Sequence, residues 1–262
     1  MLILIINELR FISLLKLIYY CIISSIGFIK GDVRMTNKDI KISKSEQTRK
    51  RIIFSYLELM RDKKWDKITV KELCEYINIT RGTFYQYFND IYDLMEQIQN
   101  QLLDDLNNRY LKLPPEAPAN YPLEQFAEKF NYTPPQRLTC WFSFCKRNKH
   151  AMTSLLNPNT GNTYFVKKLK RLLETQINIM MDNDGMPNDK MRSHFIKIFL
   201  ELHFLSARTW LDSKPGEFLP TNEIQNLLNT MRVGGSYLTY KKYTSNDYEE
   251  KMSVPEQEGE LK

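Results

Sequence analysis

The chain has 262 residues and a formal net charge of +6, and 42% of its residues are hydrophobic while 26% are charged. This composition is typical of a globular protein and excludes a wholly disordered or fibrous chain. The low glycine (9) and proline (11) contents disfavour a many-turned β-sandwich.

The first 34 residues differ in composition from the rest. The run from Phe11 to Ile29 contains one charged residue, Lys16, and is long enough to span a bilayer. If it does, the basic residues that follow it place the rest of the chain on the cytoplasmic side. Alternatively, Met35 is the true start and residues 1–34 are an over-extended N-terminus. In either case we exclude this segment from the fold.

Two helices are predicted over residues 45–63 and 70–77, because apolar residues recur there with the helical period. Each follows the spacing of a capping box, Ser43 with Glu46 and Thr69 with Glu72. The residues expected on their inner faces are Ile53, Tyr56, Leu57, Met60, Val70, Leu73, Cys74 and Ile77.

A third, very short helix is expected after Thr80, which can cap it, and Phe84 and Phe88 point to one side of it. Asn89 or Asp90 then caps a longer helix. The residues expected on one face of that longer helix are Ile91, Leu94, Met95, Ile98 and Leu102.

A proline-rich joint at 111–122 separates this part from a second helical region. Thr133, followed by two prolines, indicates a helix start, 157–161 reads as a turn, and Thr221 can cap the last helix. The predicted helices are 133–150, 163–181, 187–211 and 221–233. The tail 241–262 has almost no apolar residues and is expected to be disordered.

Residues 68–88 have the spacing of a helix-turn-helix, in which the second short helix enters the DNA major groove. Residues 36–89 also carry 12 Lys and Arg against 7 Asp and Glu, whereas residues 90–110 are acidic. Because Phe84 and Phe88 must be buried, the residues expected on or beside the exposed side are Arg81, Gly82, Thr83, Tyr85, Gln86 and Tyr87.

Several of these side chains suit DNA. Arg81 can bond guanine in a bidentate manner, and Gly82 would let the backbone approach the groove closely. The hydroxyls of Tyr85 and Tyr87 are suited to phosphate oxygens. The N-termini of the helices capped by Thr69 and Thr80 present free N–H groups that can bind phosphate, so both threonines are candidate contacts. An ordinary solvated surface is the alternative for each residue taken singly.

The segment TRGTFYQYFNDIYDLME, preceded by TVKELCEYINI, resembles the N-terminal domain of TetR/AcrR-family transcriptional regulators over about residues 45–100. The resemblance implies that Arg81 and Thr83 contact bases or the groove. It implies that Thr69, Tyr85 and Tyr87 contact phosphates. One departure is Ile91, which stands where the family often has a phosphate-contacting lysine. Affinity for the DNA phosphate backbone is then expected to depend more on Lys44, Lys71 and Arg81.

The second half matches the family only loosely, through FCKRNKHAMTSLL, FVKKLKRLL and RTWLDSKPGEFLPTNEIQNLL. The resemblance implies a ligand-binding and dimerisation domain whose last two long helices, here 187–211 and 221–233, pack against their copies. Two copies would suit a palindromic operator with half-sites about 34–36 Å apart. A small-molecule effector is implied, but its identity and binding residues are not predicted.

The histidines, cysteines and bulky hydrophobic residues of the second half have simpler explanations than a metal or redox site. His194 and His203 are nine residues apart, which does not suit metal binding, and His150 is expected near a helix C-terminus. Cys140 and Cys145 are expected to be buried and apolar in character, and the four cysteines form no CxxC pair and indicate a reducing compartment. The following bulky residues are expected either to form core or to line an effector pocket: Trp141, Phe142, Phe144, Phe165, Met180, Met181, Phe195, Phe199 and Trp210.

The sequence therefore predicts an all-α, TetR-like protein with a three-helix DNA-binding domain at 35–110 and a helical effector and dimerisation domain at 111–240. The predicted function is that of a cytoplasmic homodimeric regulator, a repressor by family habit, that binds double-stranded DNA. No enzyme motif is present and no cofactor or metal is expected. The alternative is a membrane-anchored helical interaction protein that uses residues 11–29 as its anchor.

Overall fold

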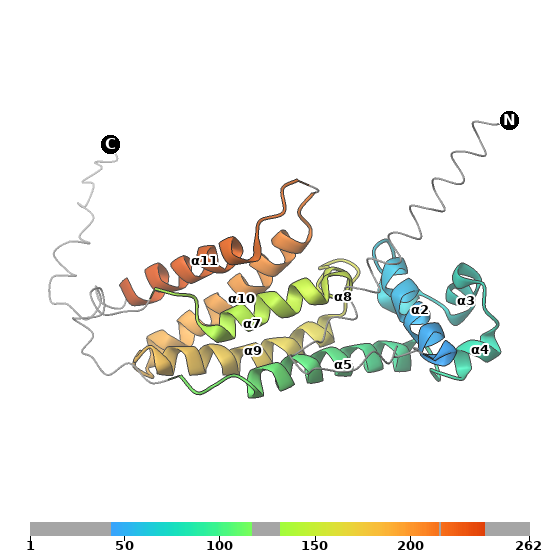
Figure 1. The fold of residues 1–262 in the computed structure, drawn as a ribbon, viewed down its shortest axis with the longest axis horizontal. Helices are drawn as coiled ribbons and strands as arrows, with labels where there is room; N and C mark the ends of the chain where they lie inside the picture. Colours follow the sequence, from blue (N-terminus) through green and yellow to red (C-terminus); the bar gives the residue numbers. More distant parts are fainter. Residues whose placement is uncertain (1–42, 117–131, 215, 239–262) are drawn as a thin grey trace, which may run out of the picture. The chain divides into compact units, whose positions relative to one another are not determined.

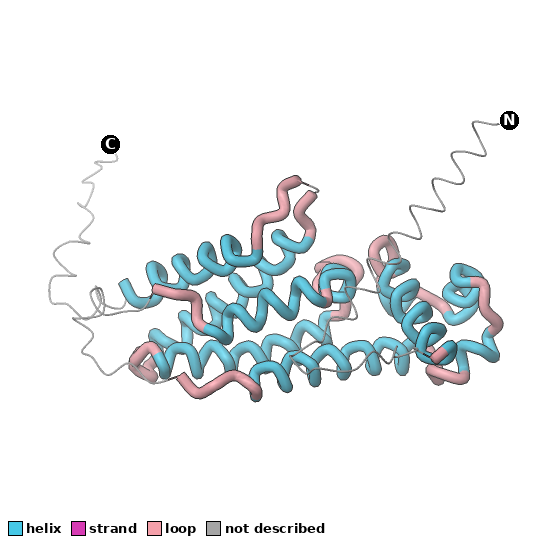
Figure 2. The backbone as a smooth tube through the Cα atoms, in the orientation of Figure 1, coloured by secondary structure: helices cyan, strands magenta, loops and turns pink. Residues whose placement is uncertain are grey.

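The computed structural model describes residues 43–116, 132–214 and 216–238. Two units meet at the boundary between Gln47 and Thr48. Regular secondary structure within the described ranges is helical throughout, so the all-α prediction is confirmed (Figures 1 and 2). The predicted anchor at 11–29 and the tail at 241–262 lie outside these ranges, as does the second half of the proline-rich joint, residues 117–122.

No helix in the described part of the chain is both long enough and apolar enough to cross a bilayer. The elements in chain order are α2 (Lys44–Leu59), η1 (Trp65–Lys67), α3 (Val70–Ile77), α4 (Arg81–Tyr85), α5 (Ile91–Leu111), α7 (Gln136–Arg147), α8 (Lys149–Leu155), α9 (Thr163–Asn183), α10 (Lys190–Leu211), α11 (Thr221–Arg232) and η3 (Val233–Leu238).

The predicted caps at the starts of α3 and α4 are present. Thr69 Oγ1 accepts from the N–H of Glu72 at 3.1 Å, and Glu72 reaches back to the N–H of Thr69, which completes the capping box. Thr80 Oγ1 accepts from the N–H of Thr83 at 3.1 Å. Because a capped helix start needs only residues three apart, these boundaries follow directly from the sequence.

Asp90, rather than Asn89, caps α5 by accepting from the N–H of Asp93 at 2.7 Å. The Asp93 carboxylate in turn accepts from the N–H of Asn89 at 2.7 Å. The side chains of residues 90 and 93 therefore satisfy two backbone donors at the helix start, which explains why an acidic residue stands at position 93.

The first helix differs from its prediction in its end and in its inner face. It ends at Leu59 rather than at Lys63. Ile52 is fully buried, whereas Ile53 is only partly buried. Of the expected set, Tyr56, Leu57 and Met60 are buried as predicted.

Three boundaries in the second half also differ. The expected helix 133–150 is divided at Asn148, whose side chain donates to the carbonyl of Phe144 at 3.1 Å, and α8 begins at the next residue. The helix expected from 187 begins at Lys190, because Asp189 caps it. Thr221 is the first residue of α11 and not its cap, a position that Pro220 occupies.

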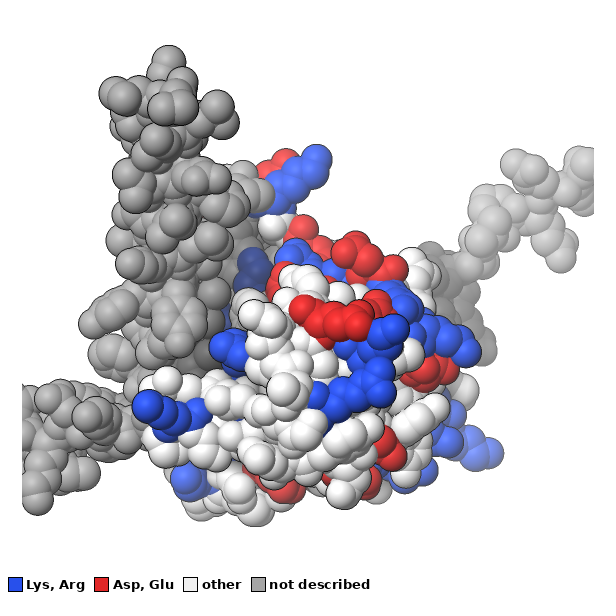
Figure 3. All heavy atoms as spheres, turned by 90° about the vertical axis from the view of Figure 1, so that its right-hand side faces the viewer, with Lys and Arg blue, Asp and Glu red and all other residues white. Residues whose placement is uncertain are grey.

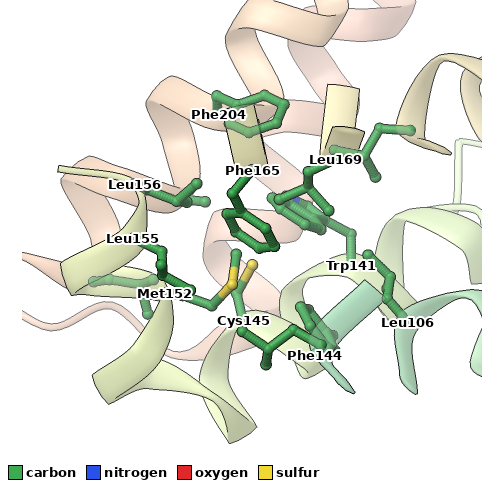
Figure 4. Close-up of a cluster of buried hydrophobic side chains, with 14 of the residues drawn as sticks. Leu106, Trp141, Phe144, Cys145, Met152, Leu155, Leu156, Phe165, Leu169 and Phe204 are labelled. Carbon is green, nitrogen blue, oxygen red and sulfur yellow. The ribbon is translucent and has the colours of Figure 1, made fainter. Parts of the chain in front are cut away.

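The second half of the described chain is a bundle built around aromatic and methionine side chains. α9 packs against α10, and α7 packs against α10 and α11, while the long α5 packs against α7 and α9. Side chains from α5, α7, α8, α9 and α10 point toward one another around Trp141 and Phe165 (Figure 4). All nine bulky residues for which core and pocket were alternatives are buried. Their burial favours the core alternative.

The turn between α8 and α9 depends on Gly161. A Cβ atom added there would lie 2.4 Å from the carbonyl oxygen of Leu155 and 2.5 Å from that of Asn157. Both are backbone atoms in a turn that is also closed by the N–H of Gly161, which donates to Asn157 at 3.0 Å. Only glycine fits this position without moving the backbone.

We therefore predict that Gly161→Ala destabilises the protein by about 1–3 kcal/mol, because the added methyl group forces the turn apart. Urea denaturation of both proteins would measure the change. Gly82→Ala serves as a matched control, since the Cβ there would meet its nearest atom at 3.7 Å. Equal midpoints for the wild type and the Gly161 variant would contradict the prediction.

Candidate nucleic-acid interface

A tight turn joins α3 to α4. Asn78 ends α3 in the left-handed conformation, with φ of 53°, and its N–H donates to the carbonyls of Cys74 and Glu75. Asparagine tolerates this region better than most residues. Two residues later, Thr80 opens α4, and the buried Cys74 thiol donates to the Thr80 carbonyl at 3.9 Å. The two short helices are thus held in the order and spacing of a helix-turn-helix, as predicted.

Two phenylalanines orient α4. Phe84 is fully buried and Phe88 is nearly so, with their ring centroids 5.7 Å apart. The guanidinium of Arg49, on α2, lies over the Phe88 ring and donates to Gln97 of α5. With one side of this five-residue helix held in the core, the opposite side must face outward.

The outward side carries most of the predicted contact residues. Arg81, Gly82, Tyr85 and Gln86 are exposed, and Tyr85 retains 54% of its accessible surface. Figure 1 shows α4 following α3 at the right-hand side of the view. The structure therefore brings these four residues onto one short segment.

The remaining predicted contacts are more mixed. Thr83 is half-buried, and its hydroxyl is hydrogen-bonded to that of Thr80 at 2.9 Å. Tyr87 is half-buried and packs partly on the core. Thr69 is exposed, but its hydroxyl is used in the cap. The cap leaves the first two N–H groups of α3 without an intrahelical acceptor, so that end can still offer donors.

Most lysines near α3 are already paired with carboxylates. Lys63 bonds Glu72 at 2.6 Å, and Lys71, a predicted phosphate contact, lies 3.9 Å from Glu75. By contrast, Arg81 and Lys67 are exposed and have no carboxylate partner among the described residues. Lys67 was not predicted as a contact. Its position two residues before Thr69 was the signal that could have indicated it.

On the face shown in Figure 3, the basic residues do not form one continuous surface. Figure 3 shows Lys and Arg side chains in patches with carboxylates among them, beside a broad area of uncharged residues. In the sequence, residues 78–89 contain a single charged side chain, that of Arg81. If this segment binds DNA, it must therefore do so with the single cation of Arg81 together with hydroxyl, amide and backbone groups.

Two further positions concern phosphate binding. Lys44 is the exposed first residue of α2, and its predicted role stays a prediction. Ile91 is buried, with 6% of its surface accessible. It packs as a core residue at the start of α5 and offers no cation there, as the sequence indicated.

Among the described residues, the histidines and cysteines form no second site. His203 is buried, and burial lowers its pKa to about 4, so it stays neutral near pH 7, while His194 is exposed. Burial raises the pKa of the Cys140 thiol to about 11. No group of three or more metal-ligating side chains occurs in the described part of the chain.

Comparisons with known proteins were made by sequence and by fold. No family model matches the chain. No curated protein matches it either. A TetR-family transcriptional regulator from Streptomyces coelicolor aligns with a TM-score of 0.50 and 19% identity, covering 78% of this chain and 86% of its own.

Two other solved structures align less closely. One is FadR from Thermus thermophilus, a TetR-family repressor in complex with lauroyl-CoA, with a TM-score of 0.40, 17% identity and coverage of 72% and 94%. The other is a TetR regulator from Rhodococcus sp. RHA1, with a TM-score of 0.38, 15% identity and coverage of 72% and 96%. The match to the Streptomyces regulator shows that this chain has a TetR-like fold.

The space around Gly82 generates a prediction. A Cβ at this position would make only ordinary contact with Thr80 Oγ1, at 3.7 Å, so the folded protein itself can accept alanine. Gly82→Ala should leave the thermal midpoint of unfolding unchanged or slightly raised, because alanine favours a helix by about 1 kcal/mol relative to glycine. The second expectation concerns DNA, which the backbone could approach closely only while this position lacks a side chain. The substitution should therefore weaken DNA binding severalfold. Differential scanning calorimetry and fluorescence anisotropy would measure the two effects, and unchanged DNA affinity would refute the close-approach role.

Proposed function

We propose that this protein is a homodimeric, sequence-specific DNA-binding transcription regulator that acts in the cytoplasm as a repressor. The observation that carries the proposal is the outward side of α4, where Arg81, Gly82, Tyr85 and Gln86 are exposed while Phe84 is buried. The TetR-like fold supports the same conclusion.

The proposed contacts divide into two kinds. Arg81 would read a base, because a guanidinium can bond both acceptors on the edge of guanine. Tyr85, the backbone N–H groups at the start of α3 and the unpaired Lys67 would bind phosphates, which position the protein without reading sequence. Thr83 is less free than the sequence suggested, because its hydroxyl is bonded within the cap.

Two substitutions separate these roles. Arg81→Ala should relax preference at one base pair, with a loss of about 1–3 kcal/mol on the preferred operator. Tyr85→Phe keeps the ring that packs edge-on against Phe84, with centroids 5.6 Å apart. Because it removes a proposed phosphate contact, it should weaken binding to the operator and to a shuffled duplex by the same factor. Binding of the full chain to its own upstream region and to a shuffled duplex, across a salt series, would measure both.

The matched controls lie on α9, outside the helix-turn-helix segment. Arg171 and Tyr164 are both exposed there, so Arg171→Ala and Tyr164→Phe remove the same chemical groups from another surface. Wild-type operator affinity in both helix-turn-helix variants would refute the assignment of the site.

The proposed dimer rests on the apolar residues that α10 and α11 leave exposed. The inward side of α11 buries Ile224 and Leu228 together with Gln225, Asn229 and Arg232. Its exposed side is partly apolar. The large apolar residues that remain 44–56% exposed on α10 and α11 are Ile198, Leu205, Leu227 and Met231.

Exposed apolar side chains at helical spacing on two adjacent helices favour coverage by another surface. α10 and α11 pack against each other, and Ile198 and Leu205 lie seven residues apart, which places them on one side of α10. A second copy of this chain would bury both stripes around a two-fold axis. The same two helices were predicted from the sequence to dimerise.

We expect Leu205→Glu to convert the dimer to a monomer, because a buried unpaired carboxylate at a two-fold interface is strongly unfavourable. Sedimentation velocity at micromolar concentration would show the change. Leu111→Glu is the control, since Leu111 is more exposed, at 73%, and lies at the end of α5. An unchanged sedimentation coefficient for the Leu205 variant would contradict this interface.

The helical bundle is proposed to modulate operator affinity through an effector. Such a ligand can do so only if it binds two arrangements of the protein unequally. The large aromatic residues of the bundle are buried in its core, so they identify no effector.

A further inference from the structure

Residues 150–160 of the bundle contact the helix-turn-helix half of the chain, at α2 and η1, in three places. Ser154 Oγ donates to the carbonyl of Leu57 on α2 at 2.9 Å, in a buried position. The N–H of Trp65 in η1 donates to the carbonyl of Thr160 at 3.2 Å. His150, the second residue of α8, makes the third contact and was expected instead near a helix C-terminus.

His150 is held by two side chains of α2. Its ring stacks on Phe54, with centroids 4.3 Å apart and an interplanar angle of 9°. Its Nε2–H donates to the carboxylate of Glu58. The side chains of His150 and Glu58 are 32% and 26% accessible, so protons and solvent can reach the pair.

The charged surroundings of this contact are simple. Among the described residues, Glu58 is the charged group bonded to His150, and its other oxygen lies 3.5 Å from the guanidinium of Arg61, two residues after the end of α2. Lys149, next to His150 on α8, points its ammonium over the ring of Phe218 at 4.5 Å.

The other helices packed against α8 carry further cations. α7 ends with Lys146 and Arg147, which are both exposed, and α10 carries Arg208 in its last turn. None of these three residues is bonded to His150 or Glu58. Glu58 therefore sits between a permanent cation, Arg61, and a titratable one, His150.

Of the three contacts, this one alone can change with pH near neutrality. The Ser154 and Trp65 hydrogen bonds involve groups that do not ionise. Histidine ordinarily changes its charge between about pH 5 and 8. Protonation would turn the His150–Glu58 hydrogen bond into a charge-assisted ion pair, and deprotonation would leave a weaker neutral bond.

We propose that His150 is a proton-responsive latch between the bundle and the helix-turn-helix half, which alters operator affinity with pH. The regulatory part rests on the DNA-binding function proposed above. The sign follows from linkage. The charge-assisted bond between His150 and Glu58 is stronger than the neutral one, so the latched arrangement is favoured at low pH and weakens as pH rises.

The chain offers a matched control, because it contains three histidines. His203 is buried and neutral across this range, since its pKa is lowered to about 4. His194 is exposed on α10. His150→Gln keeps an amide donor for Glu58 but cannot be protonated, whereas His194→Gln removes a histidine that does not touch the latch.

The first arm of the test needs no DNA. Urea unfolding of the full chain at pH 5.5 and pH 8 should show a wild-type midpoint that falls with rising pH by more than that of His150→Gln. His194→Gln should behave as the wild type. Glu58→Gln, which removes the partner and keeps the histidine, should reproduce the loss seen in His150→Gln. Identical pH profiles for the wild type and His150→Gln would overturn the latch.

The second arm measures operator affinity by fluorescence anisotropy at the same two pH values. The ratio of the two dissociation constants should differ between the wild type and His150→Gln by roughly two- to fivefold, the range that a half-exposed ion pair supports. Equal ratios together with a positive first arm would overturn its coupling to DNA binding. If no variant and no wild-type protein binds the operator, the proposed function fails, and the unfolding arm alone then judges the latch.

Discussion

The burial of Phe84 and Phe88 is the constraint on which the candidate interface depends. A five-residue helix is far too short to be stable alone, so α4 exists only because its inner side is held in the core. Arg49 adds a cation over the Phe88 ring and a hydrogen bond to α5. This packing decides which residues face outward, and it presents Arg81 and Tyr85 on the same side.

The bundle combines a tightly packed apolar interior with polar contacts at its ends and edges. Arg192, buried to 2% accessibility, donates to the carbonyls of Met186 and Asn178 and pairs with Asp182 at 2.7 Å. It thereby fixes the turn between α9 and α10. Arg232 of α11 pairs with Asp184 in the same turn. Arg232 also donates to Asn229 on the inner side of α11, where Ile224 and Leu228 are buried as well, whereas Leu227 and Met231 stay exposed on its outer side.

Much of the fold could be predicted because its determinants are local. Thr69, Thr80 and Asp90 act on N–H groups three residues away, and helical periodicity placed Phe84 and Leu94 in the core. The sequence was less informative where two neighbouring apolar residues could each occupy the buried position. Ile52 and Ile53 are both apolar, and only packing decided that Ile52 is buried. The division between α7 and α8 was missed, because Asn148 ends the helix through its side chain.

By itself, the sequence determined the helical class, the helix-turn-helix with its caps, and the identity of the side chains that α4 exposes. These depend on residues within one or two helical turns of each other. The tertiary structure alone decided which cations are already paired, such as Lys63 with Glu72, and that His150 meets Glu58 across 92 positions of sequence. Contacts of that kind depend on how whole helices pack, and no local pattern in the chain encodes the distance between two such side chains.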